Sequence, residues 1–167
     1  MPILDKHTLD FISHSPAQSL RLGTRLGSLL QVGDIICLEG DLGTGKTCLT
    51  QGMGRGMGIT QPITSPTFTL VAEYQPPSAG PLLYHVDLYR LHAPIEEAWA
   101  FGLDEYLSGI GVCVIEWAER IAEALPSERL WITLHHLDAS KRSITMTAQG
   151  NHYDKLLRRF RTAAFGV

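Results

Sequence analysis

The clearest chemical signal in the chain is the eight-residue segment from Gly40 to Thr47, which reads GDLGTGKT. It matches the phosphate-binding P-loop pattern, in which Gly, four residues and a second Gly precede Lys and then Ser or Thr. Glycine permits the tight turn that points backbone N–H groups at a phosphate. Lys46 would add positive charge at the β- and γ-phosphates, and the Thr47 hydroxyl could ligate Mg²⁺. The alternative is a plain tight turn, which needs no Lys and Thr at its end.

Two carboxylates at predicted strand ends could complete such a site. Residues 112–117 read VCVIEW, an apolar run with Glu116 near its end, which is the form of a Walker B element. Open α/β sheets bind ligands at the C-terminal edge of their strands, so we expect Glu116 at a Mg²⁺ site. Asp87 ends a second predicted strand, where it could orient a water molecule. Apolar strands often end in a charge, however, and Asp87 could instead be an N-cap or pair with Arg90.

Three other segments allow two interpretations each. The hydroxyl-rich segment 64–68 reads TSPTF and could be a loop that orders around a γ-phosphate, or a polar turn that enters a strand. His85 lies on the same strand face as Asp87, and we expect a packed histidine there rather than a ligand. The segment 52–58 alternates Gly with other residues, and a loosely wound helix terminus is favoured over a second phosphate site.

The elements around these motifs predict an α/β fold, with one P-loop NTPase domain over residues 1–167 and a mixed, mainly parallel sheet flanked by helices. Ser15 to Gln18 has the form of a capping box that begins a helix, and Gly33 and Asp34 are expected to end it. Strands 68–74 and 82–87 are expected to form an antiparallel hairpin. The other predicted strands are 8–13 (an edge strand), 35–38, 112–117, 130–137 and 143–147, and the other predicted helices are 48–57, 94–101, 118–125 and 151–165.

Composition narrows the class of protein. The 167 residues carry a net charge of −3, so there is no overall basic surface for nucleic acid. No apolar run reaches the length of a membrane span and no signal-peptide pattern is present, so a cytoplasmic protein is expected. The three cysteines form no C-x-x-C pair and are expected to be small buried apolar residues. The predicted C-terminal helix has a basic face, which is expected to be solvated rather than to dock tRNA or a partner.

Taken together, the motifs resemble the TsaE (YjeE) family of small bacterial P-loop ATPases. The matching segments follow the order of the family and spread over about half of the chain. They read GDLGTGKT at 40–47, SPTFTLVAEY at 65–74, HVDLYRL at 85–91, GLDEYL at 102–107 and IEWAER at 115–120. The combination is specific, although none of the later segments would be convincing by itself.

The resemblance implies a function that composition and spacing do not show. Members of the family take part in forming N6-threonylcarbamoyladenosine at position 37 of tRNAs that read codons beginning with A. They act with the TsaD and TsaB proteins, so contact with tRNA is expected to be indirect. ATP bound with Mg²⁺ is hydrolysed slowly by the protein alone, and hydrolysis serves turnover of the complex.

The resemblance also assigns roles to individual residues. Asp87 matches the acid implicated in hydrolysis, Thr67 matches a loop threonine near the γ-phosphate, and Lys46 matches the lysine that contacts the phosphates. Thr47 and Glu116 match the Mg²⁺ site. The residues expected to bind the nucleotide are Asp41, Leu42, Gly43, Thr44, Gly45, Lys46, Thr47, Cys48, Trp117 and Arg142.

Other classes of protein remain as alternatives. A small-molecule kinase of the P-loop class would need an acceptor pocket and usually an Arg-rich lid. A nucleotide-gated binding module would use segments 52–58 and 64–68 as moving parts. A GTPase is disfavoured because the chain has no Asn-Lys-x-Asp segment to read guanine. Arg90 and Arg120 are the candidate arginine fingers, unless a partner supplies one.

Overall fold

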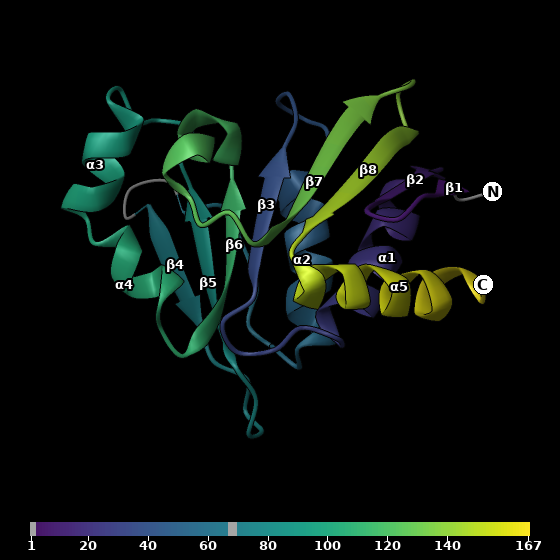
Figure 1. Ribbon diagram of the computed structural model, residues 1–167, viewed down its shortest axis with the longest axis horizontal. Helices are drawn as coiled ribbons and strands as arrows, with labels where there is room; N and C mark the ends of the chain where they lie inside the picture. Colours follow the sequence, from purple (N-terminus) through teal and green to yellow (C-terminus); the bar gives the residue numbers. More distant parts are fainter. Residues whose placement is uncertain (1–2, 67–69) are drawn as a thin grey trace.

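The structure is a computed structural model that describes residues 3–66 and 70–167. Its described residues form one eight-stranded sheet in the order β1-β2-β8-β7-β3-β6-β5-β4 (Figure 1). The strands are β1 Ile3–Leu4, β2 Thr8–Ser13, β3 Ile35–Glu39, β4 Val71–Tyr74, β5 Leu82–Asp87, β6 Gly111–Glu116, β7 Arg129–His136 and β8 Arg142–Gln149.

The sheet is mixed, as predicted, with parallel pairs at its centre and antiparallel pairs at both sides. The central strands β5, β6, β3 and β7 are parallel to one another, whereas the pairs β1–β2, β2–β8, β7–β8 and β4–β5 are antiparallel. Parallel neighbours need a long crossover, and antiparallel neighbours can follow a short turn, as the β7–β8 connection does. The expectation of a mainly parallel sheet therefore holds for the centre that carries the P-loop and not for the flanks.

Helices cover both faces of the sheet. One core cluster joins α1, α2 and α5 to one face, and a second cluster joins α3, α4 and η1 to the other. Because both faces are covered, the central strand β3 is almost continuously buried. The helices are α1 Pro16–Gly27, α2 Lys46–Gly56, α3 Pro94–Ala100, α4 Leu103–Leu107, the 3-10 helix η1 Ala118–Ala124, and α5 Asn151–Phe165.

Helix α1 begins as predicted and ends earlier than predicted. The Ser15 side chain accepts a hydrogen bond from the Gln18 N–H, and Gln18 reaches back to the His14 N–H at 2.6 Å. The last helical residue is Gly27, and a turn follows before β3. The prediction that Gly33 and Asp34 end the helix was wrong, because leucines beyond the helix end continue its apolar spacing and Leu30 is buried outside the helix.

The glycines of α2 form a close helix contact and not a loose terminus. Gly52 and Gly56 belong to α2, and Gly23 and Gly27 face them from α1. A Cβ on Gly27 would lie 2.0 Å from the Met53 carbonyl oxygen, which no real side chain tolerates. Figure 1 shows the two helices side by side along the sheet. Interdigitation of two backbones explains Gly52 and Gly56, whereas Gly54 faces Ile63 and Gly58, with a φ of 87°, follows the helix end.

The remaining predicted elements are present, except that β2 is not an edge strand, because it pairs with both β1 and β8. Strands β4 and β5 are the antiparallel hairpin, with Val71 opposite Val86, and α5 has the predicted bounds. Residues 118–124 form a 3-10 helix. Cys37 and Cys113 are buried, and Cys48 is half-buried. No helix in the described part of the chain combines the length and apolarity required for a bilayer crossing.

Candidate functional site

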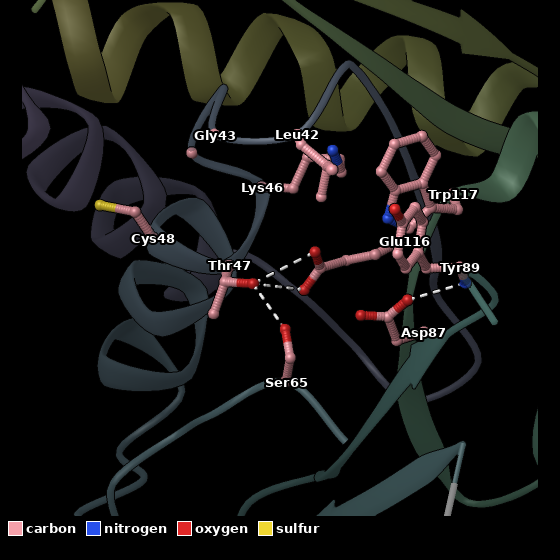
Figure 2. Close-up of a pocket in the computed structure, with 11 residues that line it drawn as sticks. Leu42, Gly43, Lys46, Thr47, Cys48, Ser65, Asp87, Tyr89, Glu116 and Trp117 are labelled. Atoms are coloured by element: carbon pink, nitrogen blue, oxygen red, sulfur yellow. Dashed lines mark hydrogen bonds between the residues drawn. The ribbon is translucent and has the colours of Figure 1, made fainter. Parts of the chain in front are cut away.

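A cavity of about 270 Å³ lies at the C-terminal edge of the parallel strands. The P-loop follows β3, Asp87 ends β5 and Glu116 ends β6, so three neighbouring strands deliver their functional groups to one place. Figure 2 shows these side chains pointing toward one another across the cavity. The residues that line it are Leu42, Gly43, Gly45, Lys46, Thr47, Cys48, Ser65, Asp87, Tyr89, Glu116 and Trp117.

The P-loop backbone has the conformation that its glycines predict. Gly43 and Gly45 have φ values of 77° and 100°, in the left-handed region where a Cβ is disfavoured. Gly45 immediately precedes α2, so the loop runs directly into the N-terminus of that helix. The buried Thr44 hydroxyl donates to the Asp41 carbonyl at 2.8 Å and closes the turn. A loop of this shape at a helix N-terminus is suited to an anion.

Lys46 is folded back over the loop that it follows. Its ammonium group donates to the Gly40 carbonyl and, at 3.0 Å, to the Asp41 carbonyl. The ring of Trp117 lies over the same group, with its centroid 4.1 Å from Nζ. Burial lowers the pKa of Lys46, and the nearby carboxylates, Glu116 first among them, oppose that shift. The lysine is thus held in place by groups that an incoming phosphate could replace.

Thr47 and Glu116 are joined by hydrogen bonds across the cavity. The Thr47 Oγ1 atom lies 2.9 Å from Oε2 and 3.2 Å from Oε1 of Glu116 (Figure 2). Because an ionised carboxylate only accepts, the threonine hydroxyl donates its single proton there. The Ser65 hydroxyl, 2.9 Å from Thr47 Oγ1, must then be the donor of that second bond. Ser65 is therefore part of the site, on the loop where only hydroxyl-rich composition indicated a role.

Asp87 faces the cavity from the end of β5. Its carboxylate accepts from the Tyr89 N–H at 2.9 Å, and burial, partly offset by this bond, raises its pKa. Arg120 donates to the Leu88 and Tyr89 carbonyls, at 2.7 and 2.8 Å, and fixes this turn. The Tyr89 ring packs on Trp117 with centroids 4.9 Å apart. Asp87 accepts from the N–H two residues on, as an N-cap does, but the next helix begins only at Pro94, and the acid lines the cavity.

Arg142 contacts the P-loop from outside the main cavity. Its guanidinium donates to the Thr44 and Gly43 carbonyls, each at 3.1 Å, and also to two carbonyls of the β7–β8 connection. A second cavity of about 160 Å³ lies here, between the P-loop and the start of α1, and Cys48 lines both cavities. Burial raises the pKa of the Cys48 thiol.

The oxygen donors around Thr47 are of the kind that Mg²⁺ prefers. Hydroxyls of Thr47 and Ser65 and carboxylates of Glu116 and Asp87 all line the cavity. Over residues 3–66 and 70–167, no cluster of three or more His, Cys, Asp or Glu side chains could hold a metal by itself. Mg²⁺ usually takes one or two protein groups together with waters and substrate phosphates, so this donor set fits that ion.

The structure brings together most of the predicted site residues. Asp41 contributes its backbone carbonyl to the lysine, and Arg142 reaches the loop only through carbonyl groups. Thr67, predicted near the γ-phosphate, lies outside the described residues. Sequence reasoning assigned no specific partner to His85, which is fully buried and lies 2.5 Å from Glu116. The sequence signal for this contact was the two-residue spacing of His85 from Asp87, which places both side chains on one face of the strand.

Comparisons with known proteins identify the family of this chain. The family described as threonylcarbamoyl adenosine biosynthesis protein TsaE matches residues 13–144. A protein of Bacillus subtilis (strain 168) named tRNA threonylcarbamoyladenosine biosynthesis protein TsaE is 44% identical over 143 residues, 85% of this chain and 87% of the relative. Its namesake from Treponema pallidum (strain Nichols) is 46% identical over 136 residues, 81% of this chain and 97% of the relative.

A solved structure extends the likeness to three dimensions. The crystal structure of Bacillus subtilis YdiB superposes with a TM-score of 0.77 and 37% identity, covering 96% of this chain and 95% of that one. The residues matched by the family, 13–144, span the P-loop, both strand-end acids and Arg142. The chain therefore belongs to the TsaE family of tRNA threonylcarbamoyladenosine biosynthesis proteins.

Proposed function

We propose that this chain binds ATP with Mg²⁺ in the main cavity and hydrolyses it. The observation that carries the proposal is the convergence of Lys46, Thr47, Asp87 and Glu116 at the mouth of one amide-lined loop. Phosphoryl transfer requires mostly positioning and charge stabilisation, and both are available from these groups.

Each side chain has a distinct role in this proposal. When ATP binds, Lys46 exchanges the carbonyls of Gly40 and Asp41 for phosphate oxygens. Its hydrogen bonds to neutral carbonyls are then replaced by stronger hydrogen bonds to anionic oxygens. Asp87 accepts a hydrogen bond from the attacking water and orients it toward the γ-phosphate. Trp117, which covers the ammonium group of Lys46, has to yield space to the phosphates.

The metal site would be formed by Thr47 and Glu116. Mg²⁺ bound there would neutralise negative charge that builds on the phosphate oxygens. Thr47 would contribute its hydroxyl oxygen, and Glu116 would complete the site with Oε1 and Oε2, directly or through water. Thr67 stays a predicted contact to the γ-phosphate.

The adenine base is proposed to lie toward the second cavity. That cavity adjoins Gly43, Thr44 and Gly45 on the side away from Asp87 and is lined by Cys48 and Arg142. A nucleotide whose phosphates occupy the P-loop could extend its base across Cys48, which lines both spaces. Arg142 would then support the loop and border the base.

Turnover by the isolated chain is expected to be slow. In the described part of the chain, no arginine lines the main cavity. Of the two predicted arginine fingers, Arg120 is engaged by two backbone carbonyls of the 88–89 turn, and Arg90 lines a neighbouring cavity rather than the main one. An arginine supplied at the transition state is worth about 10³ to 10⁵ in rate, so its absence lowers the basal rate. A partner protein is the natural source of the missing group.

We further propose that hydrolysis supports formation of N6-threonylcarbamoyladenosine at position 37 of tRNAs reading codons that begin with A. The family relationship supports the pathway. TsaD and TsaB are the proposed partners, tRNA contact is proposed to be indirect, and the cytoplasm is the proposed location. A small-molecule kinase is disfavoured, since Arg158, Arg159 and Arg161 lie on α5 and none of them lines the cavity.

The test is steady-state phosphate release by Lys46→Ala, Asp87→Ala and Glu116→Ala, each with and without the TsaD–TsaB pair. We expect each variant to lose at least 10-fold, and the pair to stimulate the wild-type chain. Lys155→Ala and Glu96→Ala remove exposed charges of α5 and α3 and are the matched controls. Wild-type rates in all three site variants would contradict the proposed ATPase, and absence of stimulation would contradict the proposed partners.

A further inference from the structure

His85 is a buried polar residue that contacts the site but has no part in the proposed mechanism. It lies in the middle of β5, between Ala72 of β4 and Val114 of β6, and its side chain is fully buried. Its Nε2 atom is 2.5 Å from Glu116 Oε2, and the Glu116 side chain is only 4% exposed. Placing a histidine inside a sheet costs free energy unless its ring nitrogens are satisfied, so this contact requires an explanation.

The contacts of the ring favour one position for its proton. A carboxylate oxygen only accepts hydrogen bonds, so Nε2 donates to Glu116. The Nδ1 atom is buried and has no hydrogen-bond partner among residues 3–66 and 70–167. A proton on Nδ1 would be a buried donor without an acceptor, whereas a bare lone pair there is less costly. The arrangement is therefore the tautomer with hydrogen on Nε2.

This bond restricts how the Glu116 carboxylate is presented. Oε2 accepts from both His85 and Thr47, whereas Oε1 contacts Thr47 alone at 3.2 Å. With Oε2 held between a strand-buried donor and the P-loop threonine, the carboxylate plane cannot rotate freely. Glu116 is the last residue of β6, where its backbone alone would leave the side chain several rotamers.

We propose that His85 is a positioning residue that locks the Glu116 carboxylate toward Thr47 and thereby sets the affinity of the site for Mg²⁺. The inference rests on the proposed function, because it assigns the metal to Thr47 and Glu116. Hydrogen bonds to metal-binding carboxylates orient them, and loss of such a partner typically weakens metal affinity about 10- to 100-fold.

Two amide substitutions test the role of the Nε2 donor. His85→Gln keeps an N–H donor at the same number of bonds from Cα as Nε2, whereas His85→Asn places its donor at the position of Nδ1. Calorimetric titration of AMP-PNP in EDTA and over a range of MgCl₂ concentrations gives the apparent Mg²⁺ dissociation constant of each protein. We expect His85→Asn to raise the apparent Mg²⁺ dissociation constant about 10- to 100-fold. We expect the constant of His85→Gln to stay within about threefold of wild type. The affinity for AMP-PNP in EDTA should be equal in the wild-type chain and both variants.

The outcomes separate this inference from the proposed function. A wild-type chain without Mg²⁺-dependent AMP-PNP binding would overturn the proposed function itself. If the wild-type chain binds AMP-PNP with Mg²⁺ and the two variants have the same Mg²⁺ affinity as each other, only the role of His85 is overturned. This holds whether that affinity is unchanged or weakened. Circular dichroism verifies that the variants are folded.

A second measurement needs no folded variant. Two-dimensional ¹⁵N NMR of the histidine side chains in the wild-type chain reports which ring nitrogen of His85 is protonated. We expect hydrogen on Nε2 and a bare Nδ1. The tautomer with its proton on Nδ1 alone would leave Nε2 without a hydrogen to donate to Glu116 and would overturn the inference.

Discussion

Asp87 and Glu116 are direct neighbours in register across the parallel strands β5 and β6, and each is the last residue of its strand. Two carboxylates therefore reach one sheet edge side by side, beside the loop that follows β3. Glu116 is held by Thr47 and His85, whereas Asp87 accepts a backbone N–H and faces the cavity. The same edge thus presents one fixed acid, suited to a metal, and one acid suited to a water molecule.

Asp87→Asn is expected to stabilise the nucleotide-free protein at pH 7. Burial raises the pKa of Asp87 above its ordinary 3.8, so ionising it costs more in the folded chain than in the unfolded one. The stability of the wild-type protein therefore falls as the pH rises from 3.8 through the raised pKa, because Asp87 loses its proton. Asn keeps the acceptor for Tyr89 and carries no charge. Because Asp87 is partly exposed, the gain should be under about 1 kcal/mol.

Thermal unfolding in EDTA at pH 7 and pH 3 measures this effect. The melting temperature at pH 7 should rise by up to about 2–4 °C, and the difference should vanish at pH 3, where Asp87 is protonated in both states. Asp10→Asn, an exposed acid of β2, should show no such gain. A less stable Asn variant at pH 7 would mean that the Asp87 carboxylate is favoured by its surroundings.

Arg142→Lys should weaken ATP binding without lowering the rate at which bound ATP is hydrolysed. The guanidinium donates to Gly43, Thr44 and the β7–β8 connection at once, and a lysine cannot reproduce that fork. Loss of about one net hydrogen bond from the ordered loop predicts a roughly 10-fold higher dissociation constant for ATP. Equilibrium binding and single-turnover hydrolysis measure the two effects, and Lys141→Ala, its exposed neighbour, is the control. A slower single turnover at unchanged affinity would contradict this role.

Gly27→Ala should destabilise the fold through the contact between α1 and α2. The new Cβ would lie 2.0 Å from the Met53 carbonyl oxygen and 2.7 Å from the Met53 Cα, so one helix must move. Overpacking of this kind costs about 1–3 kcal/mol, which urea unfolding would report as a lower midpoint at an unchanged slope. Arg21→Ala, on the exposed side of α1, should stay within about 0.5 kcal/mol. A neutral Gly27→Ala would show that the helices are not in close contact.

The sequence alone predicted those parts of the fold that depend on local pattern. The P-loop, the capped start of α1, the β4–β5 hairpin and the full extent of α5 follow from residue type and spacing, and the structure confirms them. The end of α1 was missed because leucines continue the helical spacing after Gly27. The glycines of α2 were read as weak helix, since a close contact with α1 depends on a partner distant in sequence.

The same division applies to the candidate site. Lys46, Thr47, Asp87 and Glu116 could be named because strand ends and the P-loop are visible as patterns. The partnership between His85 and Glu116 joins residues 31 positions apart and exists only through strand pairing. Arg142 was named only through the family resemblance, and its contact with the P-loop carbonyls depends on the turn between β7 and β8.

The most direct test of the account is a crystal structure of the chain grown with AMP-PNP and Mg²⁺. We predict a triphosphate held by the loop amides of residues 41–47, Lys46 on the phosphates instead of the Gly40 carbonyl, the metal beside Thr47 and Glu116, and Asp87 facing the γ-phosphate. A structure in which the nucleotide binds elsewhere, or in which Asp87 and Glu116 turn away from its phosphates, would contradict it.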